Sequence, residues 1–296
     1  MIISQNKFFT KLGFDKKSVF SSKELKFRRF LFYKIGVDKM KFVCFKLKSF
    51  LSSTAVIAVS LALIFSIQYF GAATVANLKV SAARSLPIYS VEREDKKIAI
   101  SFDCAWGTEY TDTILRYLEQ NDVKCTFFAV EFWVKKNPEY AKKIVDAGHE
   151  LGTHSRTHSY MSKLSESEIT DELKTSSETI EKITGKKPTL FRAPYGDYDN
   201  LLIDTAKEMG FYTIQWDVDS LDWKNLSANE IALRVVNGVK SGSIILCHNN
   251  GLHTAEALPM IFSTLKNRGY QFLPIGELIY KDNYVIDPSG RQKQNN

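Results

Sequence analysis

From about residue 96 onward, short apolar runs rich in β-branched and aromatic residues alternate with longer segments of helical period. Such runs are typical of buried strands. Seven of them occur, at residues 97–103, 125–130, 149–154, around Leu190, and at 211–219, 243–248 and 270–275. The alternation predicts repeated βα units in an α/β fold, and the simplest architecture for it is a closed or nearly closed barrel of parallel strands.

The segments between these strands carry helix start and stop signals. Ser165 precedes the long segment ESEITDELKTSSETIEKIT, and Gly185 follows it, as expected of an N-cap and a left-handed C-terminal residue. Further helices are predicted at TILRYLEQN, PEYAKKIVDAG, NLLIDTAKEMG, NEIALRVVNGV and ALPMIFSTLKNRG. Helices of this length are sufficient to cover the outside of a barrel.

A different pattern occupies the N-terminal part of the chain. No charged side chain occurs between Lys48 and Lys79, and residues 50–76 are dominated by Ala, Val, Ile, Leu and Phe. About 20 such residues span a bilayer, so we expect a single transmembrane helix here rather than a buried core helix, which normally shows a polar stripe. A cleavable signal peptide has a shorter apolar region of about 7 to 15 residues, which favours an uncleaved anchor.

Charge is distributed unevenly along the chain. Residues 1–48 hold thirteen Lys or Arg and three acids, a net charge of +10, which leaves about −3 for the remainder out of a total of +7. The positive-inside rule therefore predicts a cytoplasmic N-terminal arm at residues 1–49 and an extracellular domain after a linker at 77–95. Met40 is an alternative start of translation. The acidic remainder gives no reason to expect a nucleic-acid partner.

Polar residues close several of the predicted strands. Asp103, His154, Arg192 and His248 each end a strand or open the loop after it, as does the acidic group Asp217, Asp219 and Asp222. Active sites of such barrels gather at the carboxyl ends of the strands, so these clusters are expected to meet there. At least two of the three carboxylates are expected to serve as turn formers or helix caps. His149 precedes its strand and is expected at the opposite end, in a structural role.

His154 and His158 are separated by four residues. On a helical turn this spacing places both imidazoles on one face, within reach of one metal ion. The alternative is two surface histidines in a Ser-rich loop. The three cysteines after residue 100 are an odd number without CxxC spacing, so no disulfide framework is predicted.

Taken together, these motifs resemble the polysaccharide deacetylases of the NodB-homology, carbohydrate esterase type. The resemblance runs from about Lys97 to Ile279 and is carried, in order, by SFDCAWG, HSRTH, RAPYG, DSLDW and LCH. It implies a distorted (β/α)7 barrel, here preceded by the transmembrane helix, with the deacetylase domain at 96–281 and a polar tail at 282–296. FDxxWG at Phe102 to Gly107 is similar to the sporulation-associated branch.

The resemblance also implies a role for each matched residue. Asp103 matches the catalytic base and Arg192 the residue that holds it, whereas His248 matches the general acid and Asp222 the carboxylate that orients it. The family's divalent ion, with zinc expected first and cobalt, nickel or manganese as alternatives, would be held by His154 and His158. Trp223 and Leu246 match the apolar walls of the acetyl pocket, and the family analogy suggests the backbone N–H of Tyr195 as the donor to the oxyanion. Independently of the resemblance, Trp106 and Tyr195 are expected as loop aromatics that either stack on sugar rings or serve packing. Trp223 and Leu246 are also plausible as apolar core, and Arg192 as a structural ion pair.

One position departs from the family pattern. The first motif usually holds two adjacent aspartates, the second of which binds the metal, and here the second is Cys104. Three outcomes are open: the thiolate binds the metal, a water takes the place of the ligand, or Cys104 is a small buried residue.

Three functions fit this sequence. The first is a metal-dependent N-deacetylase anchored in the cell membrane and acting outside it, on peptidoglycan first and chitin-like oligosaccharides second. The second is a glycan-binding or scaffold protein of the same fold with a weakened site. The third is another metal-dependent C–N hydrolase, acting on a small amide. The oligomeric state is left open.

Overall fold

The computed structural model describes residues 61–66 and 84–295, and residues 61–66 are helical. No helix among these residues is long and apolar enough to cross a membrane. The transmembrane helix expected at 50–76 lies outside the described residues except for those six positions. The basic arm at 1–49 and the alternative start at Met40 lie outside them entirely, so these expectations stay predictions.

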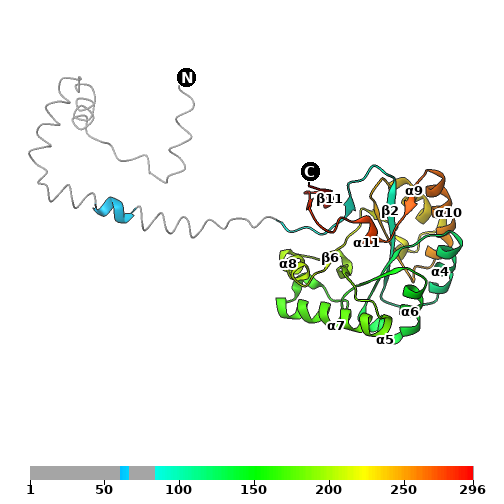
Figure 1. The fold of residues 1–296 in the computed structure, drawn as a ribbon, viewed down its shortest axis with the longest axis horizontal. Helices are drawn as coiled ribbons and strands as arrows, with labels where there is room; N and C mark the ends of the chain where they lie inside the picture. The colour runs from blue at the N-terminus through cyan, green and yellow to red at the C-terminus, as the bar shows by residue number, and fades with distance from the viewer. Residues whose placement is uncertain (1–60, 67–83, 296) are drawn as a thin grey trace, which may run out of the picture. The chain divides into compact units, whose positions relative to one another are not determined.

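The domain is built on a sheet of parallel strands (Figure 1). The strand order is β6-β5-β4-β3-β2-β8-β7, and β9 pairs with β2 off this path. The strands are β2 Lys97–Cys104, β3 Thr126–Ala129, β4 Glu150–Thr153, β5 Leu190–Phe191, β6 Tyr212–Thr213, β7 Val218–Asp219, β8 Ile244–His248 and β9 Gln271–Phe272. All seven runs identified in the sequence therefore contain strands of the sheet.

One predicted strand is divided in two. Residues 211–219 were expected to form a single strand, but β6 and β7 lie at opposite edges of the sheet. Between them, Gln215 donates its backbone N–H to Ile88 O at 2.7 Å, and Asp217 donates its own to Ile244 O at 3.2 Å. The chain thus crosses from one edge to the other without pairing the edges. The result is an α/β half-barrel rather than a fully closed one.

The helices follow one another around the outside of this sheet, from α8 and α7 through α5 and α6 to α4, α10 and α9 (Figure 1). They are α4 Thr111–Gln120, α5 Glu131–Lys136, α6 Pro138–Asp146, α7 Glu166–Thr184, α8 Asn200–Glu208, α9 Ala228–Gly238, α10 Thr254–Asn267 and the short α11 Ile275–Leu278. The predicted ends of α7 are confirmed: Ser165 forms a capping box with Glu168, and Gly185 adopts φ 73°. Among the α-helices of residues 84–295, the sequence pattern missed the short α5 and α11.

The two faces of β2 belong to two different apolar clusters. Ile98, Ile100, Phe102 and Cys104 pack in the larger core against the surrounding helices. Ala99 packs in a second cluster on the opposite face. Successive side chains of a strand point to opposite faces, so Ser101 and Asp103 share the face of Ala99.

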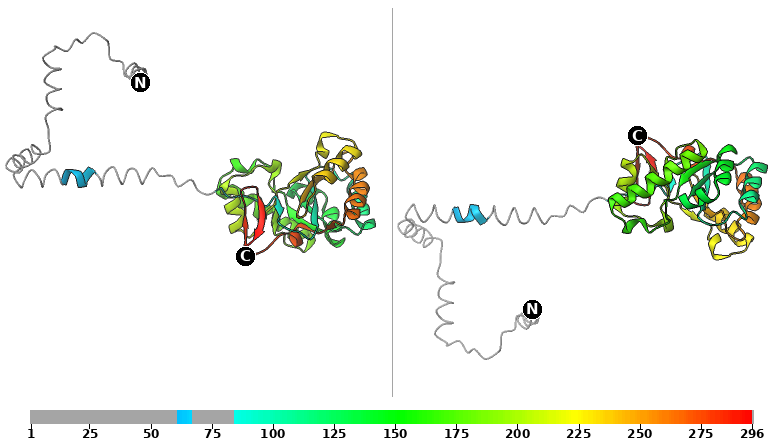
Figure 2. Two further views of the ribbon diagram at one scale, coloured as in Figure 1. Left: turned by 90° about the horizontal axis from the view of Figure 1, so that it is seen from above. Right: turned by 90° about the horizontal axis from the view of Figure 1, so that it is seen from below.

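The expected linker and polar tail are partly wrong. Residues 90–91 form β1 and pair in parallel with β11 Arg291–Gln294, which pairs antiparallel with β10 Tyr284–Ile286. Ile88 and Val91 are fully buried. The further views place the red C-terminal strands at one end of the domain, beside α8 (Figure 2). Both segments therefore belong to the folded domain, because Ile88 and Val91 complete its core and the pairing of β11 with β1 holds the C-terminal segment beside them.

Gly152 in β4 is a point of close packing. A Cβ atom there would lie 2.8 Å from two ring carbons of Phe128 and 2.9 Å from Leu190 O. We predict that Gly152→Ala destabilises the domain by about 1–3 kcal/mol, because overpacking forces neighbouring groups to move. Urea unfolding followed by circular dichroism measures this, and an unchanged midpoint would contradict the close approach.

Candidate active site

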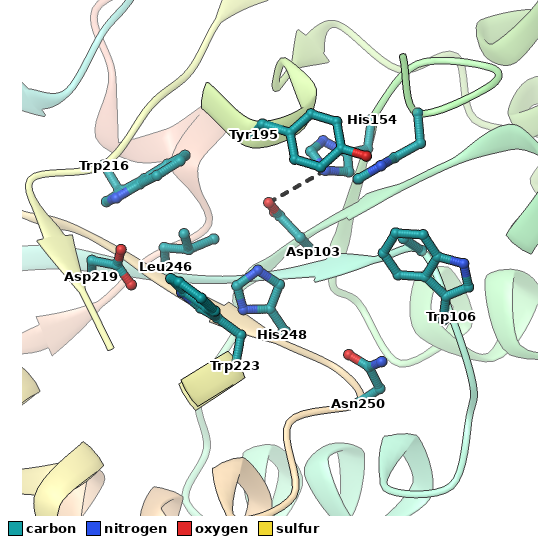
Figure 3. A pocket seen from close by; sticks show the side chains of 12 residues that line it. Asp103, Trp106, His154, Tyr195, Trp216, Asp219, Trp223, Leu246, His248 and Asn250 are labelled. Atoms are coloured by element: carbon teal, nitrogen blue, oxygen red, sulfur yellow. Dashed lines mark ion pairs between the residues drawn. The ribbon is translucent and has the colours of Figure 1, made fainter. Parts of the chain in front are cut away.

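A pocket of about 580 Å³ opens at the carboxyl ends of the parallel strands, where barrels carry their active sites (Figure 3). The strand ends and the loops after them supply its walls. The lining residues are Asp103, Ala105, Trp106, His154, His158, Tyr195, Trp216, Asp219, Trp223, Leu246, His248 and Asn250. Eight of the eleven site residues expected from the sequence therefore line one cavity, and Arg192 and Asp222 contact two of these from behind.

Asp103 is held by a fully buried arginine. Arg192 Nη1 donates to Asp103 Oδ1 and to Ser101 Oγ, each at 2.8 Å, and Arg192 Nη2 donates to Gln215 O at 3.2 Å. Burial acts to raise the pKa of Asp103, but the charge and hydrogen bond of Arg192, together with the neighbouring His154 and His248, lower the pKa overall. The carboxylate is therefore ionised at neutral pH. The ion pair that was considered as a purely structural role for Arg192 thus also keeps Asp103 in the form that can act as a base.

His248 is oriented by Asp222. The two form an ion pair of 2.7 Å from Nδ1 to Oδ1, and the other carboxylate oxygen accepts from the His248 backbone N–H at 2.7 Å and from Thr254 Oγ1 at 2.6 Å. Burial acts to lower the pKa of His248, yet the hydrogen bond and charge of Asp222 raise it overall. Since Nδ1 of His248 is hydrogen-bonded to Asp222, Nε2 is the ring nitrogen that can meet a ligand in the pocket. His248 can thus act as a proton donor.

His154 and His158 lie together at the other side of Asp103. Their ring centroids are 5.1 Å apart, and His154 Nε2 lies 3.5 Å from Asp103 Oδ2 (Figure 3). His154 Nδ1 is 2.8 Å from Arg192 O, which fixes the ring and leaves Nε2 free. Burial lowers the pKa of both histidines, that of His158 to about 4, so both imidazoles are neutral.

The helical turn expected between the two histidines is wrong. Residues 154–158 form a loop in which Ser155 and His158 have φ values of 71° and 60°. The buried carboxylate of Glu172 in α7 accepts the backbone N–H groups of Arg156 and Thr157 at 2.8 and 2.9 Å, and Thr157 Oγ1 at 2.6 Å. The imidazole rings of His154 and His158 therefore come together through an uncommon backbone conformation, which hydrogen bonds to Glu172 of α7 stabilise.

Aromatic side chains surround the mouth of the pocket. Trp106, Tyr195 and Trp223 are each 56% exposed. Tyr195 stacks on Tyr160 with ring centroids 4.3 Å apart, and its φ of 60° is unusual for a bulky residue. The exposure of Trp223 rules out the core role considered for it, whereas Leu246 is buried at the pocket wall. The rim offers flat apolar surfaces of the kind that pack on sugar rings.

Cys104 does not reach the site. Its side chain is fully buried in the core that holds Phe102, and burial raises the pKa of its thiol well above the ordinary value. The expectation that it binds metal as a thiolate is therefore wrong, because strand alternation directs position 104 away from Asp103. Of the three outcomes left open, the structure shows a small buried residue.

The site offers fewer metal-binding side chains than a catalytic zinc site normally has. Catalytic zinc is usually bound by three protein ligands. Within residues 61–66 and 84–295, no group of three or more His, Cys, Asp or Glu side chains is arranged to hold a metal ion. The buried Nδ1 of His158 has no hydrogen-bond partner among the described residues, so it offers a second neutral imidazole nitrogen beside Nε2 of His154. These residues do not complete the expected metal centre.

Other expected and unexpected residues can now be placed. His149 is buried beside Cys125 at the start of β4, away from the pocket as expected. Asp217 accepts the backbone N–H of Ile244 at 2.9 Å and Ser243 Oγ at 3.0 Å, so its carboxylate binds the start of β8 rather than forming a local turn. Trp216 and Asn250 line the pocket but were not identified from the sequence. Neither residue lies in one of the motifs named above. Trp216 lies shortly before β7, and Asn250 lies shortly after β8.

An ionised carboxylate and a carboxylate-paired imidazole, side by side at the ends of the neighbouring strands β2 and β8, define a hydrolase-type site. Residues 90–214 match the family model described as polysaccharide deacetylase. The chain is 36% identical over 196 residues to a peptidoglycan-N-acetylglucosamine deacetylase of Bacillus cereus, covering 64% of this chain and 92% of that protein. The chain belongs to the polysaccharide deacetylase family, a family of carbohydrate-directed hydrolases.

Two further relatives bear on function. YlxY of Bacillus subtilis is 36% identical over 193 residues, which is 65% of this chain and 60% of that protein. The chain thus spans less than two thirds of the length of that relative. A Bacillus anthracis protein described as a CE4 family pseudoenzyme has a solved structure with a TM-score of 0.64 and 36% identity, covering 71% of this chain and 73% of that one.

The placement of Cys104 leads to a prediction. We expect Cys104→Ala to leave zinc affinity unchanged and to cost about 1 kcal/mol of stability, because it removes only a buried sulfur from the core. His158→Ala is the matched comparison, since it removes an imidazole that faces the pocket. Zinc titration by calorimetry checks both, and a large loss of affinity in Cys104→Ala would show that the thiol reaches the metal.

Proposed function

We propose that this domain hydrolyses the N-acetyl group of a cell-envelope glycan, with peptidoglycan as the first candidate and chitin-like oligosaccharides as the second. The observation that carries the proposal is the pairing of Asp103 with Arg192 and of His248 with Asp222 on two neighbouring strands. In the register of β2 and β8, Asp103 lies directly opposite His248. The named activity of the Bacillus cereus relative supports the choice of glycan.

Asp103 would act as the base. Its free oxygen, Oδ2, is not used by Arg192 and faces His154, so it is available to accept the proton of an attacking water. The neighbouring guanidinium keeps the carboxylate ionised between turnovers. The attack of water on the acetamide carbonyl gives a tetrahedral oxyanion, for which the backbone N–H of Tyr195 is the proposed donor.

His248 would act as the acid. When the C–N bond breaks, the amine nitrogen needs a proton, and the imidazolium of His248 supplies it from Nε2 while Asp222 balances the charge at Nδ1. Acetate leaves with the oxygen of water. Asp103 then returns its proton to solvent and His248 regains one.

The proposed role of a metal is narrower than in the family pattern. Within the part of the chain that the structure describes, zinc, or cobalt, nickel or manganese, would be held by His154 and His158 alone. None of the steps above is routed through such an ion.

A second candidate is a glycan-binding protein with little or no turnover. The specific observation in its favour is that Cys104 faces the core, which leaves two imidazoles where three ligands are expected. The description of the Bacillus anthracis relative as a pseudoenzyme shows that such a state occurs within the family. The aromatic rim would serve glycan binding under either candidate.

Acetate release from peptidoglycan and from chitin oligomers, measured with and without added zinc, separates the two candidates. We expect wild-type turnover, and a loss of at least about 100-fold in Asp103→Asn, because the base is removed. That variant also leaves the buried Arg192 without its counter-charge, at a cost of about 3 kcal/mol, so its fold must be checked by circular dichroism. Binding of glycan without any acetate release by the wild type would favour the second candidate.

The pair of Asp222 and His248 predicts a pH effect. The carboxylate raises the pKa of His248, so Asp222→Asn should lower it, and the imidazole then loses its proton at a lower pH. We expect kcat near pH 7 to fall by about 100-fold, with the alkaline limb of the kcat profile displaced to lower pH. An alkaline limb that does not move in Asp222→Asn would show that another group donates the proton.

A further inference from the structure

The charges that line the pocket are almost all balanced within the protein. Asp103 is paired with Arg192 at 2.8 Å, and His248 with Asp222 at 2.7 Å. The remaining lining histidines, the buried His154 and the half-buried His158, are neutral. The two ion pairs and the two neutral histidines thus contribute little net charge to the pocket.

Asp219 is the exception. Its Oδ1 accepts the backbone N–H of Leu221 at 2.8 Å, and its carbonyl oxygen, rather than its carboxylate, accepts from Arg234 Nε at 2.7 Å. The described part of the chain shows no ion pair to its carboxylate. Asp219 lies at the end of β7, beside Trp223 and Leu246 and on the opposite side of His248 from Trp106 (Figure 3).

No lysine or arginine lines the pocket. The cation of Lys224 lies 4.8 Å from the ring centroid of Trp223, and the side chain is exposed. A ligand inside the pocket therefore meets one unbalanced carboxylate and no fixed cation among the lining residues. The aromatic or apolar walls are Trp106, Tyr195, Trp216, Trp223 and Leu246. This environment disfavours a negatively charged ligand group.

We infer that the pocket selects uncharged N-acetylated sugar units over units that carry a carboxylate next to the acetamido group, and that Asp219 determines this selectivity. The inference rests on the proposed function and names the substrate class of the same site. Peptidoglycan contains both kinds of unit: glucosamine units are neutral, whereas muramic acid units carry a lactyl ether on the carbon adjacent to the acetamide. Once its stem peptide is removed, that lactyl group is a free carboxylate.

Because the lactyl carbon and the acetamide are neighbours on the ring, a sugar that places its acetamide between Asp103 and His248 also carries its carboxylate into the pocket. Repulsion from Asp219 is strongest at low ionic strength and weakens as salt screens it. A neutral sugar experiences no such repulsion. The selectivity should therefore depend on salt, which a purely structural role of Asp219 does not predict.

The test compares two probes on the full chain: N,N′,N″,N‴-tetraacetylchitotetraose, which is neutral, and stem-free peptidoglycan tetrasaccharide, which carries lactyl carboxylates. Binding is measured by calorimetry with excess chelator, because a bound divalent cation would itself attract the carboxylate. We expect the wild type to bind the neutral probe at least about tenfold more tightly at low salt. This ratio should shrink in 0.5 M NaCl, where the Debye length is only about 4 Å.

Asp219→Asn should reduce the preference by about tenfold, since its amide oxygen can still accept from Leu221 N while the charge is lost. Glu208→Gln is the matched control: it removes one charge from an exposed position at the end of α8 and should leave the ratio unchanged. Circular dichroism verifies the fold of each variant, and the salt series on the wild type tests the charge effect without any substitution.

Equal binding of both probes by the wild type overturns the inference, and so does a preference that neither salt nor Asp219→Asn changes. Binding of the neutral probe without selectivity leaves the proposed function standing. If neither probe binds, the proposed function fails, and the inference fails with it.

Discussion

The buried ion pair between Arg192 and Asp103 is the interaction on which the rest of the site depends. Arg192 is fully buried, with its guanidinium 4.2 Å from the ring centroid of Phe128 and in contact with Ser101 and Gln215. It connects β5 to β2 across the inside of the half-barrel. Since an arginine cannot be neutralised in such a place, the carboxylate must stay charged beside it. Its backbone carbonyl also orients His154, so base and imidazole share one support.

Strand register and strand alternation decide which side chains enter the pocket. The pairing of β2 with β8 sets Asp103 opposite His248, and the two-residue period sends Cys104 into the core with Phe102. Strand alternation therefore brings Asp103 and His248 to one face of the sheet and directs the Cys104 thiol to the other face, where it cannot bind a metal in the pocket. Among the described residues, the metal expected in this family would have two imidazoles as ligands. The chemistry of the site therefore depends on the acid–base groups and on the charge of the pocket.

The loop at residues 154–158 shows how tertiary contacts override local spacing. Four-residue spacing suggested a helical turn, but Glu172, distant in the sequence, accepts two backbone N–H groups and holds the loop in another form. The two rings still meet, for a different reason. In the same way, residues 211–219 read as one apolar run, yet the half-barrel divides them between two edges, because the chain must cross the opening there.

The sequence by itself determined the βα alternation, the ends of α7, and the identity of the residues at the strand ends, because periodicity, capping and turn residues act locally. It also placed Asp103, Arg192, Asp222 and His248 at one site, since carboxyl ends of parallel strands converge. Only the tertiary structure decided that β6 and β7 do not pair with each other, that Cys104 faces the core, and that Asp219 keeps an unbalanced charge. Those outcomes depend on partners far apart in the chain, whose approach no local pattern encodes.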